Sequence, residues 1–132
     1  MNSTPELQPI YDWLKGFSKA VRDRDYESGR RFFAEEVIGF GSVAERCDGL
    51  ENLEVRQWRK VWDFTTGFEF DLDNTAVNAD HQMAWAASSW QSFGKSASGE
   101  PVLRRGRSTF VFRKEEDQWL AVHSHFSLEP KA

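Results

Sequence analysis

"GRSTFVFRKEEDQWLAVHSHFS", residues 106–127, decides the fold of this chain. Apolar and polar residues alternate on both sides of the acidic turn "EED" at residues 115–117, as they do in strands with one buried face. The stretch therefore predicts a β-hairpin. It also places His123 and His125 two positions apart on the second strand, where both side chains would share one face.

Upstream of the hairpin, the first half of the chain has a helical period. A stripe of apolar residues at three- and four-residue spacings predicts the first helix: Leu7, Ile10, Leu14, Phe17 and Val21. A short second helix is expected to begin after Asp25 as its cap and to run to about Ala34. A third is expected to begin at Asp48 and Glu51, which have the spacing of a capping box.

From residue 68 onward the period is two. This pattern predicts four strands, at residues 68–73, 82–93, 102–114 and 118–128. Helices followed by a strand meander indicate an α+β fold, and 132 residues suffice for a single domain over 1–132. In a strongly curved sheet the helices cover the concave face, so we expect an internal pocket between the two layers.

The composition limits the possible partners. A net charge of −4 argues against nucleic acid and against an anionic membrane surface, since both require a basic footprint. Six Trp and eleven Phe in so short a chain indicate a thick core or a ring-lined cavity. The single cysteine, Cys47, excludes an intramolecular disulfide, and no signal-peptide pattern or apolar run of transmembrane length occurs, so a cytoplasmic protein is expected.

The hairpin carries a resemblance to a known family. Arg107 and Thr109 precede the turn, and the strand after it reads W-x-x-V-H-x-H-x-S, from Trp119 through His123 and His125 to Ser127. This arrangement resembles the nuclear transport factor 2-like superfamily, in particular its SnoaL-like branch. The resemblance implies a cone-shaped curved sheet, antiparallel or mixed, packed against three N-terminal helices, with an internal pocket and a dimer through the outer sheet face.

The superfamily resemblance does not by itself imply a function, because the superfamily includes ketosteroid isomerase, cyclases, dehydratases, a kinase association domain and binding proteins. The isomerase's carboxylate base would fall on Gly41, so that base is missing. Tyr11 lies roughly where the isomerase has its oxyanion tyrosine, although a tyrosine on an apolar stripe more often belongs to the core. The pocket arginines of the association domain would fall on Ala87, Phe110 and Phe126. We therefore expect an apolar, aromatic pocket and disfavour an anionic ligand held by arginines.

We predict that the pocket is lined by aromatic rings and small hydroxyl groups. These side chains occupy the positions of neighbouring strands and helices that are expected to face inward. They are Tyr11, Trp58, Trp62, Trp85, Ser108, Phe110, Ser124 and Phe126.

The alternate residues of the last strand, Trp119, His123 and His125, are predicted to point to the outer face of the sheet and to form a dimer interface there. The two histidines could also bind a metal or act as acid and base. A metal site would need a third ligand, which is not evident, so no metal and no cofactor are expected. A β-bulge in this strand would reverse the assignment of faces.

Three functions remain open. The first is binding of a small apolar or aromatic molecule by a homodimer. The second is a cofactor-free isomerase, cyclase or dehydratase that uses a buried Tyr, Asp or His, because burial can shift a pKa into a useful range. The third is a dimeric association domain without a ligand.

Overall fold

The computed structural model describes residues 6–130. Its helices are α1 (Gln8–Asp23), α2 (Tyr26–Arg30) and a continuous segment formed by α3 (Leu50–Leu53), the π-helix η1 (Glu54–Trp58), α4 (Arg59–Val61) and the 3-10 helix η2 (Trp62–Phe64). A second 3-10 turn, η3, spans Leu72–Asn74. The strands are β1 (Phe33–Phe40), β2 (Cys47–Asp48), β3 (Thr66–Phe70), β4 (Ala76–Ala79), β5 (Met83–Lys95), β6 (Pro101–Glu115) and β7 (Gln118–Leu128).

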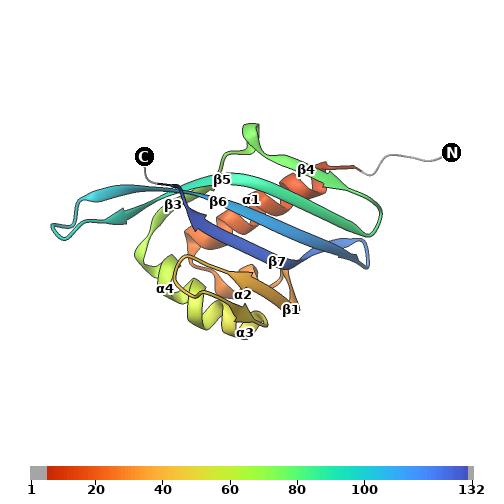
Figure 1. The fold of residues 1–132 in the computed structure, drawn as a ribbon, viewed down its shortest axis with the longest axis horizontal. Helices are drawn as coiled ribbons and strands as arrows, with labels where there is room; N and C mark the ends of the chain where they lie inside the picture. Colours follow the sequence, from red (N-terminus) through yellow and green to blue (C-terminus); the bar gives the residue numbers. More distant parts are fainter. Residues whose placement is uncertain (1–5, 131–132) are drawn as a thin grey trace.

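One mixed, curved sheet organises the molecule (Figure 1). Its strand order is β2-β1-β7-β6-β5-β3, and β4 pairs with β5 as well. Among the strand pairs within residues 6–130, the β1–β7 pair is parallel and the others are antiparallel. Helix α1 runs along one face of the long strands, and the other helices gather beside β1. This arrangement confirms the predicted α+β class with a curved mixed sheet and helices on its concave side.

Helix α2 begins as predicted, and the apolar stripe predicted for α1 is buried, although α1 itself begins at Gln8. In α1, Ile10, Leu14 and Phe17 are at most 1% exposed, so the apolar stripe faces the core. Asp25 caps α2, because its carboxylate accepts a hydrogen bond from the Ser28 backbone N–H at 3.1 Å. Helix α2 is shorter than expected: it ends at Arg30, and the chain then enters β1.

The third helical segment departs from prediction at two points. Gly49, with φ of +90°, precedes it, and the expected capping box of Asp48 and Glu51 does not form. The π-helical turn η1 then adds a residue to one turn, which rotates the following residues relative to a regular α-helix. Trp58 and Trp62 are buried, at 4% and 5% exposed, whereas Phe64 at the end of the segment is 71% exposed.

A β-bulge in β7 corrects the predicted faces of the last strand. Val111 pairs with His123 but the next residue, Phe112, pairs with Ala121, so Val122 is an extra residue. Because the alternation restarts there, Trp119 is only 6% exposed and belongs to the core. The prediction that Trp119 shares an outer face with the histidines is wrong.

Candidate functional site

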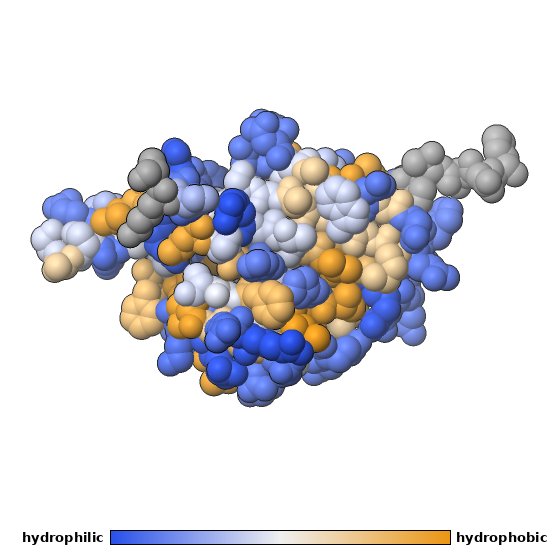
Figure 2. Space-filling model, viewed as in Figure 1, coloured by the Kyte–Doolittle hydropathy of each residue, from blue (hydrophilic) through white to orange (hydrophobic). Residues whose placement is uncertain are grey.

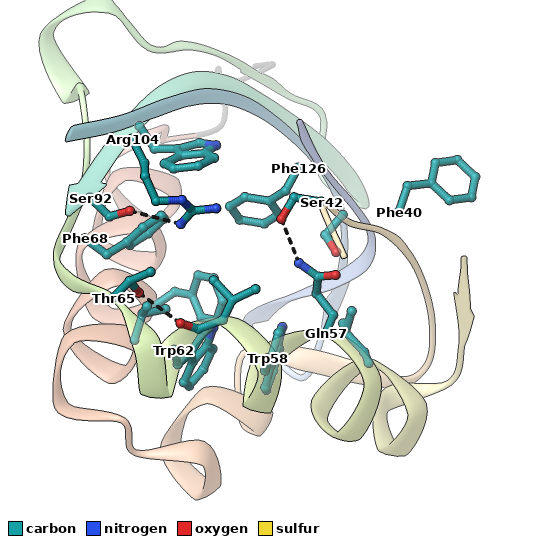
Figure 3. Close-up of a pocket in the computed structure, with 16 residues that line it drawn as sticks. Phe40, Ser42, Gln57, Trp58, Trp62, Thr65, Phe68, Ser92, Arg104 and Phe126 are labelled. Atoms are coloured by element: carbon teal, nitrogen blue, oxygen red, sulfur yellow. Dashed lines mark hydrogen bonds between the residues drawn. The ribbon is translucent and has the colours of Figure 1, made fainter. Parts of the chain in front are cut away.

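A cavity lies between the helical segment Leu50–Phe64, helix α1 and the concave face of the sheet (Figure 3). Its volume is about 50 Å³. Sixteen residues line it: Phe17, Val21, Phe40, Ser42, Leu53, Gln57, Trp58, Val61, Trp62, Thr65, Phe68, Trp90, Ser92, Arg104, Ser124 and Phe126. Most are apolar or aromatic, and the side chain of Phe40 points away from the others.

Two stacked tryptophans form the helical wall. The rings of Trp58 and Trp62 lie 4.7 Å apart at 18°, and Tyr26 stacks on Trp62 from outside the cavity at 4.9 Å and 8°. The Arg59 guanidinium lies 4.1 Å from the centre of the Tyr26 ring. A Cβ at Gly29 would lie 2.8 Å from Trp62 Cη2, so this position leaves room for the stack. The column holds both indoles in one orientation.

Glu54 stabilises the helical wall on the side away from the cavity. Its carboxylate accepts hydrogen bonds from Arg30 at 2.9 Å and from Arg59 at 2.7 Å. Burial raises the pKa of Glu54, but the hydrogen bonds from the two arginines outweigh it and hold that pKa below its ordinary value. Glu54 does not line the cavity. It is therefore an ionised structural anchor.

Three rings form the sheet wall. Phe68 lies 5.7 Å from Trp90, and Phe126 lies 6.1 Å from Trp90 and 6.2 Å from Phe68. Beside them Ser124, only 2% exposed, places its hydroxyl next to Gly39, where a Cβ would come within 3.2 Å of it. The Trp90 indole N–H is buried without a partner in the described chain. Its ring packs against Gly106, where a Cβ would be 2.2 Å from Trp90 Cζ2.

Arg104 is the one charged residue among the sixteen that line the cavity. Its guanidinium points inward, towards the space beside Phe126 (Figure 3). Nη1 donates to Ser92 Oγ at 3.3 Å, and Cζ lies 5.6 Å from the centre of the Trp90 ring. The aliphatic stem crosses Gly94, where a Cβ would be 3.2 Å from Arg104 Cδ. Burial lowers the pKa of Arg104, with no carboxylate of residues 6–130 opposing that shift.

Gln57 fills the place where the isomerase resemblance would put a base. Its Oε1 accepts from the backbone N–H groups of Val43 at 3.0 Å and Ala44 at 2.8 Å, and its Nε2 donates to Ser42 Oγ at 3.2 Å. A Cβ at Gly41 would lie 2.3 Å from Gln57 Cδ. A carboxylate side chain at position 41 has no room in this arrangement.

Comparison with known proteins agrees with this geometry. The family model described as SnoaL-like domain matches residues 10–130. The chain belongs to this family. No curated protein matches the chain significantly.

Solved structures share the SnoaL-like fold at low identity. A nuclear transport factor 2-like superfamily protein from Salmonella enterica has a TM-score of 0.79 and 18% identity, covering 94% of this chain and 91% of that one. A ketosteroid isomerase-like protein from Erwinia carotovora atroseptica has a TM-score of 0.77 and 16% identity, covering 96% and 98%. The association domain of CaMKII from C. elegans has a TM-score of 0.71 and 18% identity, covering 91% and 93%. At these identities the likeness shows the fold alone.

Four of the eight residues predicted to line the pocket of this SnoaL-like domain do line its cavity: Trp58, Trp62, Ser124 and Phe126. Ser108 and Phe110 are buried deeper, where Ser108 donates to the Ser88 carbonyl at 3.2 Å and Phe110 packs 4.8 Å from Trp13. Tyr11 is half-buried outside the cavity, its hydroxyl 3.5 Å from the Thr75 carbonyl oxygen.

Trp85 does not line the pocket of the SnoaL-like domain. It is 43% exposed on the outer face, because its neighbours Ala84 and Ala86 are the inward residues of β5 at 4% and 0% exposed. Sequence reasoning assigned the opposite parity to this strand. It also missed Arg104, although Arg104 has the same parity on β6 as Ser108 and Phe110 and could have been found from that alternation.

The histidines lie on the outer face of the SnoaL-like domain, around Phe40. The Phe40 ring lies 5.1 Å from that of His123 and 5.5 Å from that of His125. His123 Nδ1 is 2.8 Å from the Ile38 carbonyl oxygen, and His125 is exposed. Within residues 6–130, no three His, Cys, Asp or Glu side chains gather as metal ligands. None of the helices described there is long and apolar enough to cross a bilayer.

Proposed function

We propose that this SnoaL-like domain binds a small, largely apolar or aromatic molecule between its helices and the concave face of its sheet. The observation that carries this proposal is the ring-lined cavity, with Trp58 and Trp62 on one side and Phe68, Trp90 and Phe126 on the other. The two indoles stack on each other, and Tyr26 stacks on Trp62 from outside the cavity. Ring-lined concave sites with a few polar groups are typical of ligand pockets.

The size of the cavity narrows the ligand class. About 50 Å³ is far below the roughly 300–1,000 Å³ common for pockets that enclose drug-sized ligands. An apolar cavity of about 150 Å³ binds benzene, so a single ring enters this space only where wall side chains move or where part of the ligand reaches outside it. A molecule of steroid size is far too large, so the likeness to a ketosteroid isomerase-like protein supports the fold and not that substrate.

The lining favours binding over catalysis. A cofactor-free isomerase, cyclase or dehydratase needs a proton donor or acceptor within hydrogen-bond reach of its substrate. The sixteen lining residues include no Asp, Glu, His or Tyr in the described chain. Tyr11, the earlier candidate, lies outside the cavity.

We further propose that two copies associate through the outer face of the sheet. Met83 and Trp85 are 42% and 43% exposed on that face, and Phe40 lies there between the two histidines. Figure 2 shows hydrophobic residues among polar ones over the sheet side of the molecule. A solved relative is an association domain, which supports this second role alongside ligand binding.

A fragment screen tests the binding proposal. Single-ring and short apolar fragments are screened by thermal shift and by tryptophan fluorescence, first on the parent protein and then on Ser124→Phe and on Trp85→Phe as a control outside the cavity. Binding is expected to be lost in Ser124→Phe alone, because the new ring fills the cavity. If no fragment binds and Ser124→Phe costs about 1–3 kcal/mol, as overpacking does in a solid core, the proposal is wrong.

A further inference from the structure

The cavity contains a positive charge that nothing in the described chain neutralises. Five other arginines form ion pairs with carboxylates: Arg30, Arg31, Arg46, Arg59 and Arg113. Arg105 and Arg107 are exposed to solvent. Arg104 alone is half-buried in a ring-lined cavity with a serine hydroxyl as its hydrogen-bond partner.

A guanidinium in such a place is costly unless a counter-charge reaches it. A half-buried charge loses part of its hydration, and a hydroxyl acceptor with a distant ring face returns only part of that free energy. The lost hydration can be recovered when a ligand brings a negative charge into the cavity. The same desolvation strengthens that interaction, because the local dielectric is lower than in water.

We propose that the ligand of this cavity is a small monocarboxylate with an apolar or aromatic body, and that Arg104 binds its carboxylate. This inference rests on the proposed binding function and specifies its ligand class. It departs from the expectation, drawn from the sequence, that an anionic ligand held by arginines is disfavoured. That expectation rested on the three positions that correspond to the pocket arginines of the association domain, and position 104 is not among them.

The geometry assigns each part of such a ligand to a wall. One guanidinium N–H of Arg104 is used by Ser92 Oγ, which fixes the orientation of the group and leaves other N–H donors for a carboxylate. The apolar body would then lie between the stacked indoles of Trp58 and Trp62 and the ring of Phe126. Ser124 Oγ is a further polar group in the same wall.

The charge count favours a carboxylate over a phosphate. Arg104 is the single cation of the lining, so a monoanion is matched and a dianion is left half compensated. A guanidinium also matches the planar geometry of a carboxylate. A phosphoester with the same ring should therefore bind less tightly than the carboxylate.

The test uses three probes that share one ring: benzoate, its neutral amide benzamide, and phenyl phosphate. Dissociation constants are measured by calorimetry or by tryptophan fluorescence on the parent protein, on Arg104→Met and on Arg104→Lys. Arg105→Met is the matched control, because Arg105 is the next residue of the same strand and is exposed. Urea unfolding of each variant confirms that it is folded.

On the parent protein we expect benzoate to bind at least about tenfold more tightly than benzamide, the effect of one charge-assisted hydrogen-bonded pair. Arg104→Met should remove this preference while benzamide affinity changes by less than about twofold. Arg104→Lys should retain part of it, and Arg105→Met all of it.

Contrary outcomes separate this inference from the function on which it rests. If benzamide binds as tightly as benzoate, or if Arg104→Met keeps the preference, the cavity binds ligands but the carboxylate inference is wrong. Tighter binding of phenyl phosphate would overturn the carboxylate class. If none of the probes and no neutral fragment binds, the proposed function fails, and this inference fails with it.

Discussion

The side chain of Gln57 occupies the space beside Gly41, with its Cδ and Oε1 both 2.3 Å from where a Cβ of residue 41 would lie. The amide holds the loop after β1 by accepting from two consecutive backbone N–H groups. The position at which an isomerase-like protein would carry its base is therefore filled by a structural amide.

Gly41→Asp should destabilise the protein and should not create an enzyme. The new side chain must displace Gln57, which breaks its hydrogen bonds to Val43 and Ala44 and costs about 1–3 kcal/mol of unfolding free energy. Urea unfolding measures the loss. In the Gln57→Ala background the same substitution should cost less, because the clash is gone. Equal costs in both backgrounds would show that Gln57 is not the obstacle.

Glu54→Gln should weaken the helical wall and alter its response to acid. The pKa of Glu54 is lowered on folding, so its carboxylate contributes stability above its unfolded pKa of about 4.5, and this contribution is lost as the pH falls through the lower folded value. At pH 7 the variant should lose on the order of 1–3 kcal/mol, since two arginines lose a charged acceptor.

Urea unfolding at pH 7 and in the acid range measures this effect. The gap between parent and Glu54→Gln should shrink on acidification. Glu51→Gln is the matched control, because that carboxylate is largely exposed and forms an ion pair with one of the same arginines, Arg30. A gap that is constant from neutral to acid pH would contradict the assigned role of Glu54.

The outer sheet face should form a dimer. Light scattering at micromolar concentration is expected to give about twice the chain mass of 15.3 kDa. Trp85→Glu should shift the protein towards monomer, because it places a charge in the apolar face. Val55→Glu introduces the same charge at a side chain that is 46% exposed on the helical segment, and it should leave the mass unchanged. A parent protein that is monomeric at this concentration would refute the dimer.

Folding should not depend on a bound metal. The two histidines lack a third nearby ligand in the described chain, and His123 already contacts the Ile38 carbonyl. Elemental analysis of protein purified without an affinity tag, together with unfolding in the presence and absence of a chelator, tests this. Stoichiometric metal that disappears in His125→Ala would contradict the prediction and favour the enzyme alternative.

Much of the fold could be predicted because, in long segments, the spacing of apolar residues alone indicates a helix or a strand and its buried face. The stripe from Ile10 to Val21 and the alternation of β6 depend on local spacing, and both are buried as that spacing indicates. The family resemblance then supplied the order of the layers, which no local pattern contains.

The site was harder to predict because single-residue irregularities decide which side chains face the cavity. The extra residue at Val122 moved Trp119 from the outer face into the core, and the parity of β5 placed Trp85 outside. Arg104 was missed for a different reason. The low hydropathy of arginine predicts a surface position, whereas the alternation of β6 places residue 104 on the inward face.

The π-helical turn at Glu54–Trp58 makes the cavity depend on chain length as well as on residue identity. The turn absorbs one extra residue, and each residue of a regular helix turns by about 100°, so deletion of one codon between Trp58 and Trp62 would rotate Trp62 away from its stacking partners. A single genetic event could thus abolish the ring wall while leaving every tryptophan in the gene. Within this family, an alignment that conserves aromatic residues but not the spacing of this helix would therefore overstate the similarity of two pockets.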